Sequence, residues 1–452
     1  MNKPHVLLIT VDSLRFDRCP RRPYGTVTAP NVAELSEEAI TFSQAVSNGP
    51  ATRSSFPSIL TSTHPLAYGG YSYLDNARPF IAKTLAEEGF QTVGYHSNPH
   101  LGADENYDMG FSEFRDAAEG SESIASTKDF VERRLDTDTW LYKLLRRFWH
   151  YFTMSTGTSA YAKASSITEN ALSWIDTTWD GESSFFMWLH YMDVHYPFSP
   201  PNKYVEQNGD TPIPMSRTTE LNGRMQEEPE TLLEEDVDDL LTLYDGEVRF
   251  VDEQIGHIIE HLRNIGIYEE TLLVITADHG EAFGEHDRFG HHPNLYDELL
   301  RVPLVIRVPG TDSRDVEQQV SLVDLGPTIY DIVDIPIPDN VQGTSFAPLL
   351  RGDTMDEPVA LVTAKGGDRL ACRTSHWKCF WRRDDETVEL FDLRSDREEV
   401  MDVSTDNPEH VSRFKEIMEE YITEAEATDT DLPKMSKSDE VEERLKDLGY
   451  ID

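Results

Sequence analysis

The sequence predicts an α/β fold in which helices flank a large, mostly parallel sheet, with a small antiparallel sheet near the C-terminus. Apolar strand patterns alternate with amphipathic helical patterns through roughly the first 350 residues, as in parallel sheets that are covered on both faces. After residue 352 the candidate strands become short and closely spaced, which is typical of antiparallel pairing. We therefore expect a large domain over residues 1–352 and a smaller subdomain over residues 353–452.

The expected elements follow one another in a regular order. Short runs of apolar and β-branched residues predict buried strands, which we place at residues 5–11, 91–95, 184–191, 272–277 and 303–308. Apolar residues at helical spacing predict helices at residues 80–88, 165–179, 231–264 and 320–332. The C-terminal subdomain is expected to contain strands at 359–363, 369–373, 377–381 and 387–393, and helices at 408–425 and 440–448.

The charge of the chain excludes one class of partner. Its 452 residues include 83 Asp and Glu against 40 Lys and Arg, which gives a formal net charge of −43. So acidic a surface repels a phosphate backbone, and we expect no binding to nucleic acid. The acids are spread along the chain, a bias typical of salt-loving microbes, whose concentrated salt screens the self-repulsion.

The cellular location is inferred from cysteine use and from the N-terminus. Cys19, Cys372 and Cys379 have no metal-ligand spacing, so we expect free thiols in a reducing compartment. The first strand follows Lys3 at once, without the pattern of a signal peptide. No apolar run approaches the length of a transmembrane helix. These features predict a soluble cytoplasmic protein, while its oligomeric state stays unknown.

Residues 140–152 are aromatic and net positive within this acidic chain. A helix over this segment would be apolar nearly all round, which usually means that it packs against the body of the protein. The alternative is a rim element that touches a lipid surface or an anionic substrate.

Two expected strands end in side chains that bind cations. The strand that precedes Asp278 and His279 turns away at Gly280, and the first strand ends at Asp12. The carboxyl ends of strands in open α/β sheets are where ligands bind. Two carboxylates there suit a hard divalent cation, although Asp12 could instead cap the following helix.

At these positions the chain resembles the sulfatase branch of the alkaline phosphatase superfamily. The resemblance includes VDSLRFD at 11–17 and ADHGE at 277–281. Further matching segments lie, in order, at 29–35, 47–52, 58–61, 189–197, 295–304 and 389–393. It implies an alkaline-phosphatase-like sandwich and a catalytic α/β domain over residues 1–352.

The resemblance places Thr52 at the nucleophile position. Sulfatases carry a Cys or Ser there, which is oxidised to formylglycine under the guidance of a following Pro and Arg; all of these are absent here. Relatives in the superfamily use a metal-bound Thr, whose alkoxide the cation stabilises. Thr52 could also be a helix N-cap, and Ser54 and Ser55 are rival nucleophiles with a poorer match.

The resemblance and the chemistry together imply one metal site made of Asp12, Thr52, Asp278 and His279. Sulfatases commonly supply a second N-terminal Asp, where this chain has Ser13, and calcium-type members often have Asn where His279 stands. Exchanging a carboxylate for an imidazole shifts the preference from Ca²⁺ toward Mn²⁺ or Zn²⁺. Mg²⁺ and Ca²⁺ stay open as alternatives.

Two histidines are expected to contact the substrate. His195 stands at the family's substrate-binding position, in a loop after a strand, whereas His190 inside that strand is expected to be a core residue. An alternative second metal site would combine Asp193, His195 and His292.

His291 stands where sulfatases place a lysine near the leaving oxygen, and an imidazolium there could protonate that oxygen. Arg53 is a further candidate for holding the anion, through forked hydrogen bonds.

The leading hypothesis is a metal-dependent, sulfatase-like hydrolase that cleaves a sulfate or phosphate ester through a covalent intermediate on Thr52. The substrate would be a small molecule, a glycan or a lipid headgroup. The first alternative is a phosphodiesterase or a phosphoglycerol-type transferase that passes the group to an alcohol. The second is a binding protein that keeps the fold without turnover.

Overall fold

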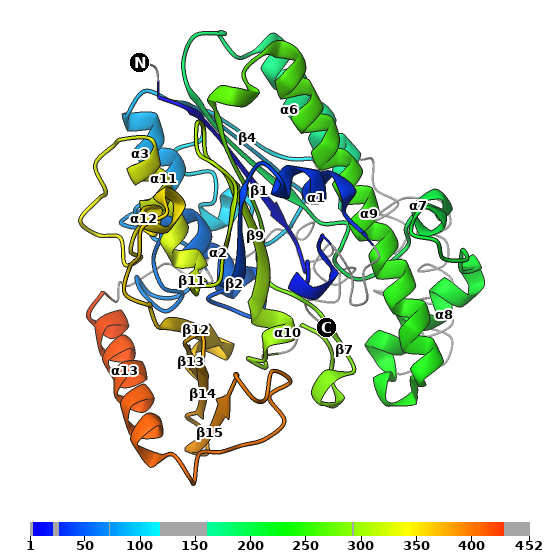
Figure 1. The fold of residues 1–452 in the computed structure, drawn as a ribbon, viewed down its shortest axis with the longest axis vertical. Helices are drawn as coiled ribbons and strands as arrows, with labels where there is room; N and C mark the ends of the chain where they lie inside the picture. The colour runs from blue at the N-terminus through cyan, green and yellow to red at the C-terminus, as the bar shows by residue number, and fades with distance from the viewer. Residues whose placement is uncertain (1–2, 21–26, 72, 118–160, 292, 429–452) are drawn as a thin grey trace, which may run out of the picture.

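The computed structural model describes residues 3–20, 27–71, 73–117, 161–291 and 293–428. Helices cover both faces of a large central sheet, and a smaller sheet lies below it in the view of Figure 1. The α/β class predicted from the sequence is confirmed. The segments expected to be helical at 140–152 and 440–448, and the candidate ligand His292, lie outside the described residues.

The central sheet has the strand order β10-β2-β9-β6-β1-β5-β3-β4, with β11 beside β2. Its strands are β1 (His5–Val11), β2 (Ile40–Val46), β3 (Gln91–His96), β4 (Glu113–Asp116), β5 (Phe185–Tyr191), β6 (Thr271–Ala277), β9 (Arg301–Arg307), β10 (Arg314–Val316) and β11 (Val320–Ser321). Strand β9 runs antiparallel to both of its neighbours, and the other pairs are parallel. Every residue of β1, β5 and β6 is buried, as expected where helices cover both faces.

Two helical layers enclose this sheet. One layer contains α1 (Pro30–Ser36), α6 (Ala164–Thr177) and α9 (Glu234–Ile265), with α7 (Asn202–Gln207) and α8 (Met215–Glu227) packed on α9. The other contains α2 (Thr52–Thr61), α3 (Ile81–Glu87), α11 (Leu325–Ile332) and α12 (Ala347–Arg351). The region expected to form one or two helices at 231–264 is the single helix α9.

The C-terminal sheet is antiparallel, as predicted. It consists of β12 (Ala360–Ala364), β13 (Arg369–Arg373), β14 (Trp377–Arg382) and β15 (Thr387–Asp392). The helix α13 (Pro408–Ala427) packs on one face through Phe414, Met418 and Tyr421. The other face packs on Val46, Leu295 and Leu300. The division of the chain at residue 352 stays a prediction.

The helix expected at 320–332 needs a correction, because it begins five residues later. Val320 and Ser321 instead extend the edge of the sheet as β11, paired with Ala45 and Val46. A reciprocal hydrogen-bonded cap between Ser321 and Asp324 then starts a 3-10 turn, and α11 follows from Leu325. Edge pairing and this capping box therefore override the helical periodicity at the start of the segment.

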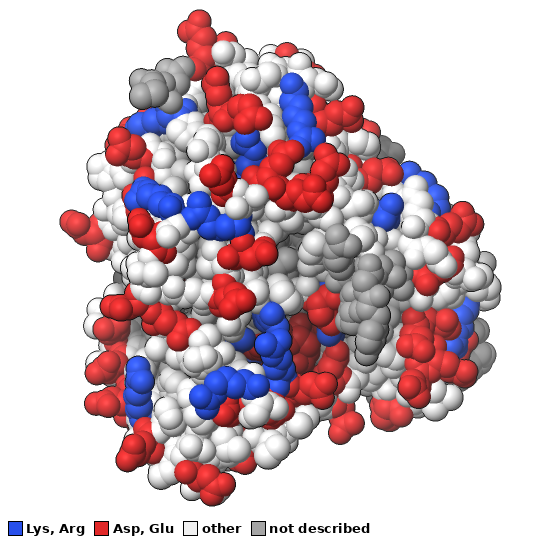
Figure 2. All heavy atoms as spheres, in the orientation of Figure 1, with Lys and Arg blue, Asp and Glu red and all other residues white. Residues whose placement is uncertain are grey.

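Acidic side chains are spread over the face shown in Figure 2, with groups of Lys and Arg between them. Among the described residues, no helix is long and apolar enough to cross a membrane.

Candidate active site and metal centre

Neighbouring strands bring the predicted metal ligands together. Val11 at the end of β1 pairs in register with Ala277 at the end of β6, so Asp12 and Asp278 leave the sheet side by side. On the other side of β1, Thr10 pairs with His190 of β5. Because these strands are parallel, all three side chains lie at the same edge of the sheet.

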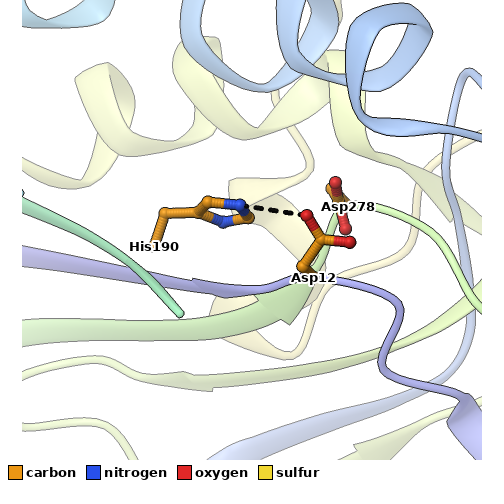
Figure 3. Close-up of side chains that lie close together, drawn as sticks. All are labelled: Asp12, His190 and Asp278. Atoms are coloured by element: carbon orange, nitrogen blue, oxygen red, sulfur yellow. Dashed lines mark ion pairs between the residues drawn. The ribbon is translucent and has the colours of Figure 1, made fainter. Parts of the chain in front are cut away.

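These three residues form a compact, fully buried group at the strand ends (Figure 3). One ligand atom from each of Asp12, His190 and Asp278 lies within 4.8 Å of the other two. His190 Nε2 is 3.3 Å from Asp12 Oδ2. His279 flanks the group, with Nε2 3.5 Å from Asp12 Oδ1 and 3.5 Å from Asp278 Oδ2.

Hydrogen bonds turn the lone pairs of both imidazoles toward the carboxylates. His279 Nδ1 lies 2.7 Å from the carbonyl oxygen of Gly280, which can only accept, so this nitrogen carries the proton. His190 Nδ1 lies 3.0 Å from Thr10 Oγ1, which already donates to Leu189 O. His190 Nδ1 therefore donates as well, and in the neutral rings the Nε2 atoms of His190 and His279 are unprotonated.

This donor set fits a divalent cation. Two fully buried carboxylates and two imidazole lone pairs converge, and Asp278 Oδ2 has no hydrogen-bond partner among the described residues. A buried carboxylate oxygen without a partner is costly, and a bound cation is the usual remedy. Mixed carboxylate and imidazole ligation favours Mn²⁺ or Zn²⁺ over Ca²⁺.

Thr52 points its hydroxyl at this group. It is the first residue of α2 and fully buried, and Oγ1 lies 3.3 Å from Asp12 Oδ2 and 3.5 Å from His279 Nε2. The N-cap position belongs to Ala51, and the helix has no side-chain cap. The alternative role of Thr52 as a capping residue is therefore wrong. The positive end of the helix dipole instead faces the hydroxyl, where it favours a developing negative charge.

The rival hydroxyls are bonded to the backbone. Ser54 Oγ donates to Ala51 O, and Ser55 Oγ lies within hydrogen-bond distance of Ala51 O and Gly49 O. None of these three contacts is directed at the carboxylates. Of these three hydroxyls, Thr52 is the one that contacts the candidate metal ligands.

The ionisation of the site follows from its burial and from its mixed charges. Burial acts to raise the pKa of Asp12, but His195, His190 and His279 outweigh it and hold that pKa below its usual range. Burial and then the charge of Asp12 raise the pKa of Asp278 well above its ordinary value. Burial lowers the pKa of His279 to about 4, which keeps its ring neutral near pH 7 and able to ligate.

The two predicted substrate histidines lie next to this group and differ from each other. The rings of His195 and His291 are 4.8 Å apart, and the ring of His291 is 4.9 Å from that of His279. Burial lowers the pKa of His195 to about 4. Burial also acts to lower the pKa of His291, but Glu281, with Oε1 3.6 Å from Nδ1, outweighs it and raises that pKa. His291 is therefore the better proton donor of the pair.

Sequence reasoning missed Asn98. It follows β3, the strand beside β5, and its Nδ2 donates to Asp12 Oδ2 at 3.0 Å and lies 3.5 Å from Thr52 Oγ1. Its position just after a predicted strand could have suggested a role at the site. Using that signal would have required knowing that β3 lies two strands from β1.

His190 is buried, as expected of a core histidine, but its Nε2 also faces Asp12 within the candidate ligand group. Two other candidates are directed elsewhere. The carboxylate of Asp193 accepts a hydrogen bond from Ala164 N at 2.7 Å and pairs with Lys163 Nζ at 3.4 Å. These contacts direct it toward Ala164 and Lys163 rather than toward His195. The Arg53 guanidinium lies 3.9 Å from Glu105, and its contact with an anion stays a prediction.

Comparison with known proteins decides the family. Residues 4–335, most of the chain, match the family profile described as Sulfatase. The chain belongs to the sulfatase family. This confirms the resemblance to the alkaline phosphatase superfamily that the sequence motifs implied, and identifies an ester hydrolase. Residues 284–427 of this sulfatase-family chain also match the profile described as N-sulphoglucosamine sulphohydrolase, C-terminal.

Several relatives resemble this sulfatase-family chain over different lengths. An arylsulfatase of Clostridium perfringens is 23% identical, with 96% of this chain and 98% of that protein covered. Human arylsulfatase K is 33% identical over 35% of this chain and 32% of its own length. Among solved structures, the phosphonate monoester hydrolase of Agrobacterium radiobacter has a TM-score of 0.70 at 19% identity, covering 94% of this chain and 96% of that one.

Another structural neighbour has a TM-score of 0.71 at 17% identity, covering 94% of this chain and 99% of that one. It was solved in complex with its substrate, D-glucosamine-2-N,6-O-disulfate. At these identities the structural neighbours establish the shared fold. The alkaline-phosphatase-like architecture predicted from the sequence is confirmed.

Proposed function

We propose that this protein is a metal-dependent hydrolase that cleaves a sulfate or phosphorus ester by transferring the acidic group to Thr52 and then to water. The observation that carries the proposal is the position of the Thr52 hydroxyl. It lies within 3.5 Å of Asp12, His279 and Asn98, at the N-terminus of a helix. A hydroxyl held against this many ligand-type groups suits nucleophilic catalysis better than packing.

The cation would be held by Asp12, Asp278 and His279, with His190 beside them and the Thr52 oxygen facing it. When bound, it would stabilise the deprotonated hydroxyl and polarise the ester. Mn²⁺ and Zn²⁺ are the preferred candidates, with Mg²⁺ and Ca²⁺ as alternatives to be compared.

In the resting site Thr52 Oγ1 would already be deprotonated, its proton having passed to solvent. In the first step this oxygen forms a bond to sulfur or phosphorus while the bond to the ester oxygen breaks. His291 donates a proton to that leaving oxygen. The neutral His195 ring and the Asn98 amide contact the transferred group and keep it in line. In the second step water attacks the Thr52 ester, and His291 takes up a proton from the water, which restores the starting state.

Phosphorus chemistry is favoured over the formylglycine route of sulfatases. Thr52 cannot be oxidised to formylglycine, because the aldehyde requires a primary carbon. The fold shared with phosphonate monoester hydrolases is consistent with a phosphorus ester. A neighbour with a sulfated glucosamine substrate supports a sugar-sized ester. Transfer to an alcohol, as in a phosphodiesterase or a phosphoglycerol-type transferase, is distinguished by adding a glycol acceptor and analysing the products.

The test compares wild-type protein and Thr52→Ala on 4-nitrophenyl sulfate, 4-nitrophenyl phosphate and bis(4-nitrophenyl) phosphate, each with the four metals. We expect Thr52→Ala to lose at least about a thousandfold in turnover, as losses of a nucleophile usually do. Ser54→Ala is the matched control, because it removes a hydroxyl two residues away that bonds the backbone. Equal turnover by wild-type protein and Thr52→Ala would refute the nucleophile, and no turnover by wild-type protein would favour a binding role.

A further inference from the structure

Residues 280–299 form a long excursion of the chain, which links the candidate metal site to the proposed proton donor. Gly280 N donates to Leu299 O at 2.8 Å, which closes the base of the excursion just after His279. A Cβ at position 280 would lie 2.0 Å from Glu298 O, so only glycine allows this close approach. His291 lies further along the excursion, with its ring 4.8 Å from that of His195 and 4.9 Å from that of His279.

A residue of the C-terminal sheet forms hydrogen bonds with the excursion close to His291. Arg369, the first residue of β13, donates from Nη1 to Pro293 O at 3.2 Å and to Asn294 Oδ1 at 2.9 Å. These acceptors lie two and three residues after His291. The Arg369 guanidinium therefore bonds both the backbone and a side chain of the segment that carries the His291 imidazole.

A buried cluster of charges fixes the next residues of the same excursion. The Asp297 carboxylate takes a forked pair of hydrogen bonds from Arg373, at 3.0 and 2.7 Å, and a third from Lys378 Nζ at 2.8 Å. Glu399 accepts from Asp297 N at 2.7 Å and pairs with Lys378. Two cations face two acidic side chains here, and the forked bonds from Arg373 fix the orientation of the Asp297 carboxylate.

An aromatic stack ties the earlier part of the excursion to the same sheet. The Tyr296 ring packs against Phe380 and Phe391 of the sheet, with ring centroids 5.0 and 6.3 Å apart. The Tyr296 ring also stacks on the ring of His286, with centroids 3.5 Å apart and an angle of 6° between the planes. His286 has a φ of 52°, a strained value for a residue with a Cβ, which persists only where neighbours hold it.

From these contacts we infer that Arg369 is a positioning residue, which sets the place of the His291 imidazole at the leaving oxygen from the C-terminal sheet. The inference rests on the proposed role of His291 as proton donor. Displacing a reacting group by about 1 Å can cost on the order of a hundredfold in rate. Loss of Arg369 should therefore affect proton donation. The candidate metal ligands should stay in place, because the hydrogen bond from Gly280 N to Leu299 O does not depend on Arg369.

The test is Arg369→Met, with Arg383→Met as the matched control. Arg383, in the turn directly after β14, donates to Gly367 O at 3.3 Å, and within the described part of the chain no hydrogen bond joins it to the excursion. Turnover is compared on phenyl and 4-nitrophenyl esters of the acidic group that wild-type protein accepts best. A poor leaving group needs the proton more than a good one. We expect Arg369→Met to lose about 10- to 100-fold in kcat on the phenyl ester, and only a few-fold on the 4-nitrophenyl ester.

A double-mutant cycle separates this inference from the proposed function. In the His291→Ala background, Arg369→Met should have no further effect on the phenyl ester, because Arg369 acts through the missing ring. Arg369→Lys, which keeps one donor group, should restore part of the lost rate. Equal losses on the two esters, or additive effects with His291→Ala, would overturn the inference. If His291→Ala itself were silent while Thr52→Ala stayed inactive, the positioning role would fall and the nucleophile would stand.

Discussion

Replacing Asp278 by Asn should stabilise the metal-free protein while it abolishes the response to metal. Ligand atoms of Asp12 and Asp278 lie within 4.8 Å of each other in a fully buried site. Two unit charges at this distance repel by about 3.5 kcal/mol at an effective dielectric constant of about 20. The raised pKa of Asp278 relieves part of this repulsion by proton uptake, so the expected gain is about 1 to 3.5 kcal/mol.

The substitution keeps the hydrogen bonds that hold residue 278 in place. Asp278 Oδ1 accepts from His279 N at 2.9 Å and from Ser13 N at 3.3 Å, and the amide oxygen of Asn can accept both. The new amide nitrogen would lie near His279 Nε2, 3.5 Å from the present Oδ2, where it can donate to a bare nitrogen. For a chain of 452 residues the gain corresponds to a rise in Tm of about 1 to 4 °C.

The assay is thermal unfolding with EDTA and then with MnCl₂ or ZnCl₂, beside turnover of the best aryl ester. Wild-type protein should gain stability from metal, because ligands that bind the native state raise Tm, whereas Asp278→Asn should gain little and turn over no substrate. The control is Asp245→Asn, since this buried carboxylate faces Arg18 at 3.2 Å and its neutralisation should lower Tm. A metal-free Asp278→Asn that melts below wild-type protein would refute the repulsion between the carboxylates.

Two further predictions concern stability away from the site. Because the formal charge is −43, Tm should rise between about 0.1 and 1 M KCl as the Debye length falls from about 10 to 3 Å; a fall in Tm would contradict adaptation to high salt, and an osmolyte without charge is the control. Burial raises the pKa of Asp324 to about 7. The folded state therefore favours its protonated form, and the associated stability, present below about pH 4, is lost as the pH rises to 7. That loss amounts to at most about 4 kcal/mol at 1.36 kcal/mol per pH unit. Asp324→Asn should thus become more stable relative to wild-type protein between pH 4 and 7, measured by urea unfolding; a constant difference across this range would show that the carboxyl ionises normally.

The two carboxylates of the candidate metal site were predictable from the sequence because they depend on local facts. Asp12 and Asp278 each follow a run of buried apolar residues, and the carboxyl ends of parallel strands share one edge of a sheet. Thr52 was found by resemblance to sulfatases, and the structure brings its hydroxyl to the same edge. These residues could be identified once a parallel sheet was predicted, without knowing the order of its strands.

His190 and Asn98 could not be assigned in the same way. Whether a histidine inside a strand is a core residue or a ligand depends on the neighbouring strand and on the register. Here β5 lies beside β1 and sets His190 against Thr10, one residue before Asp12. Asn98 reaches Asp12 because β3 comes next in the sheet. Strand order arises from long-range packing and leaves no periodic pattern in the chain.

The sequence by itself determined the α/β class, most strands and helices, the acidic character and the pair of strand-end carboxylates, because periodicity and composition act over a few residues. Only the tertiary structure decided the antiparallel course of β9, the edge strand at Val320–Ser321, the second imidazole at the candidate metal centre and the hydrogen bonds from Arg369 to the excursion that carries His291. Each of these depends on contacts between residues far apart in the chain, whose free energy appears only once the sheet has assembled.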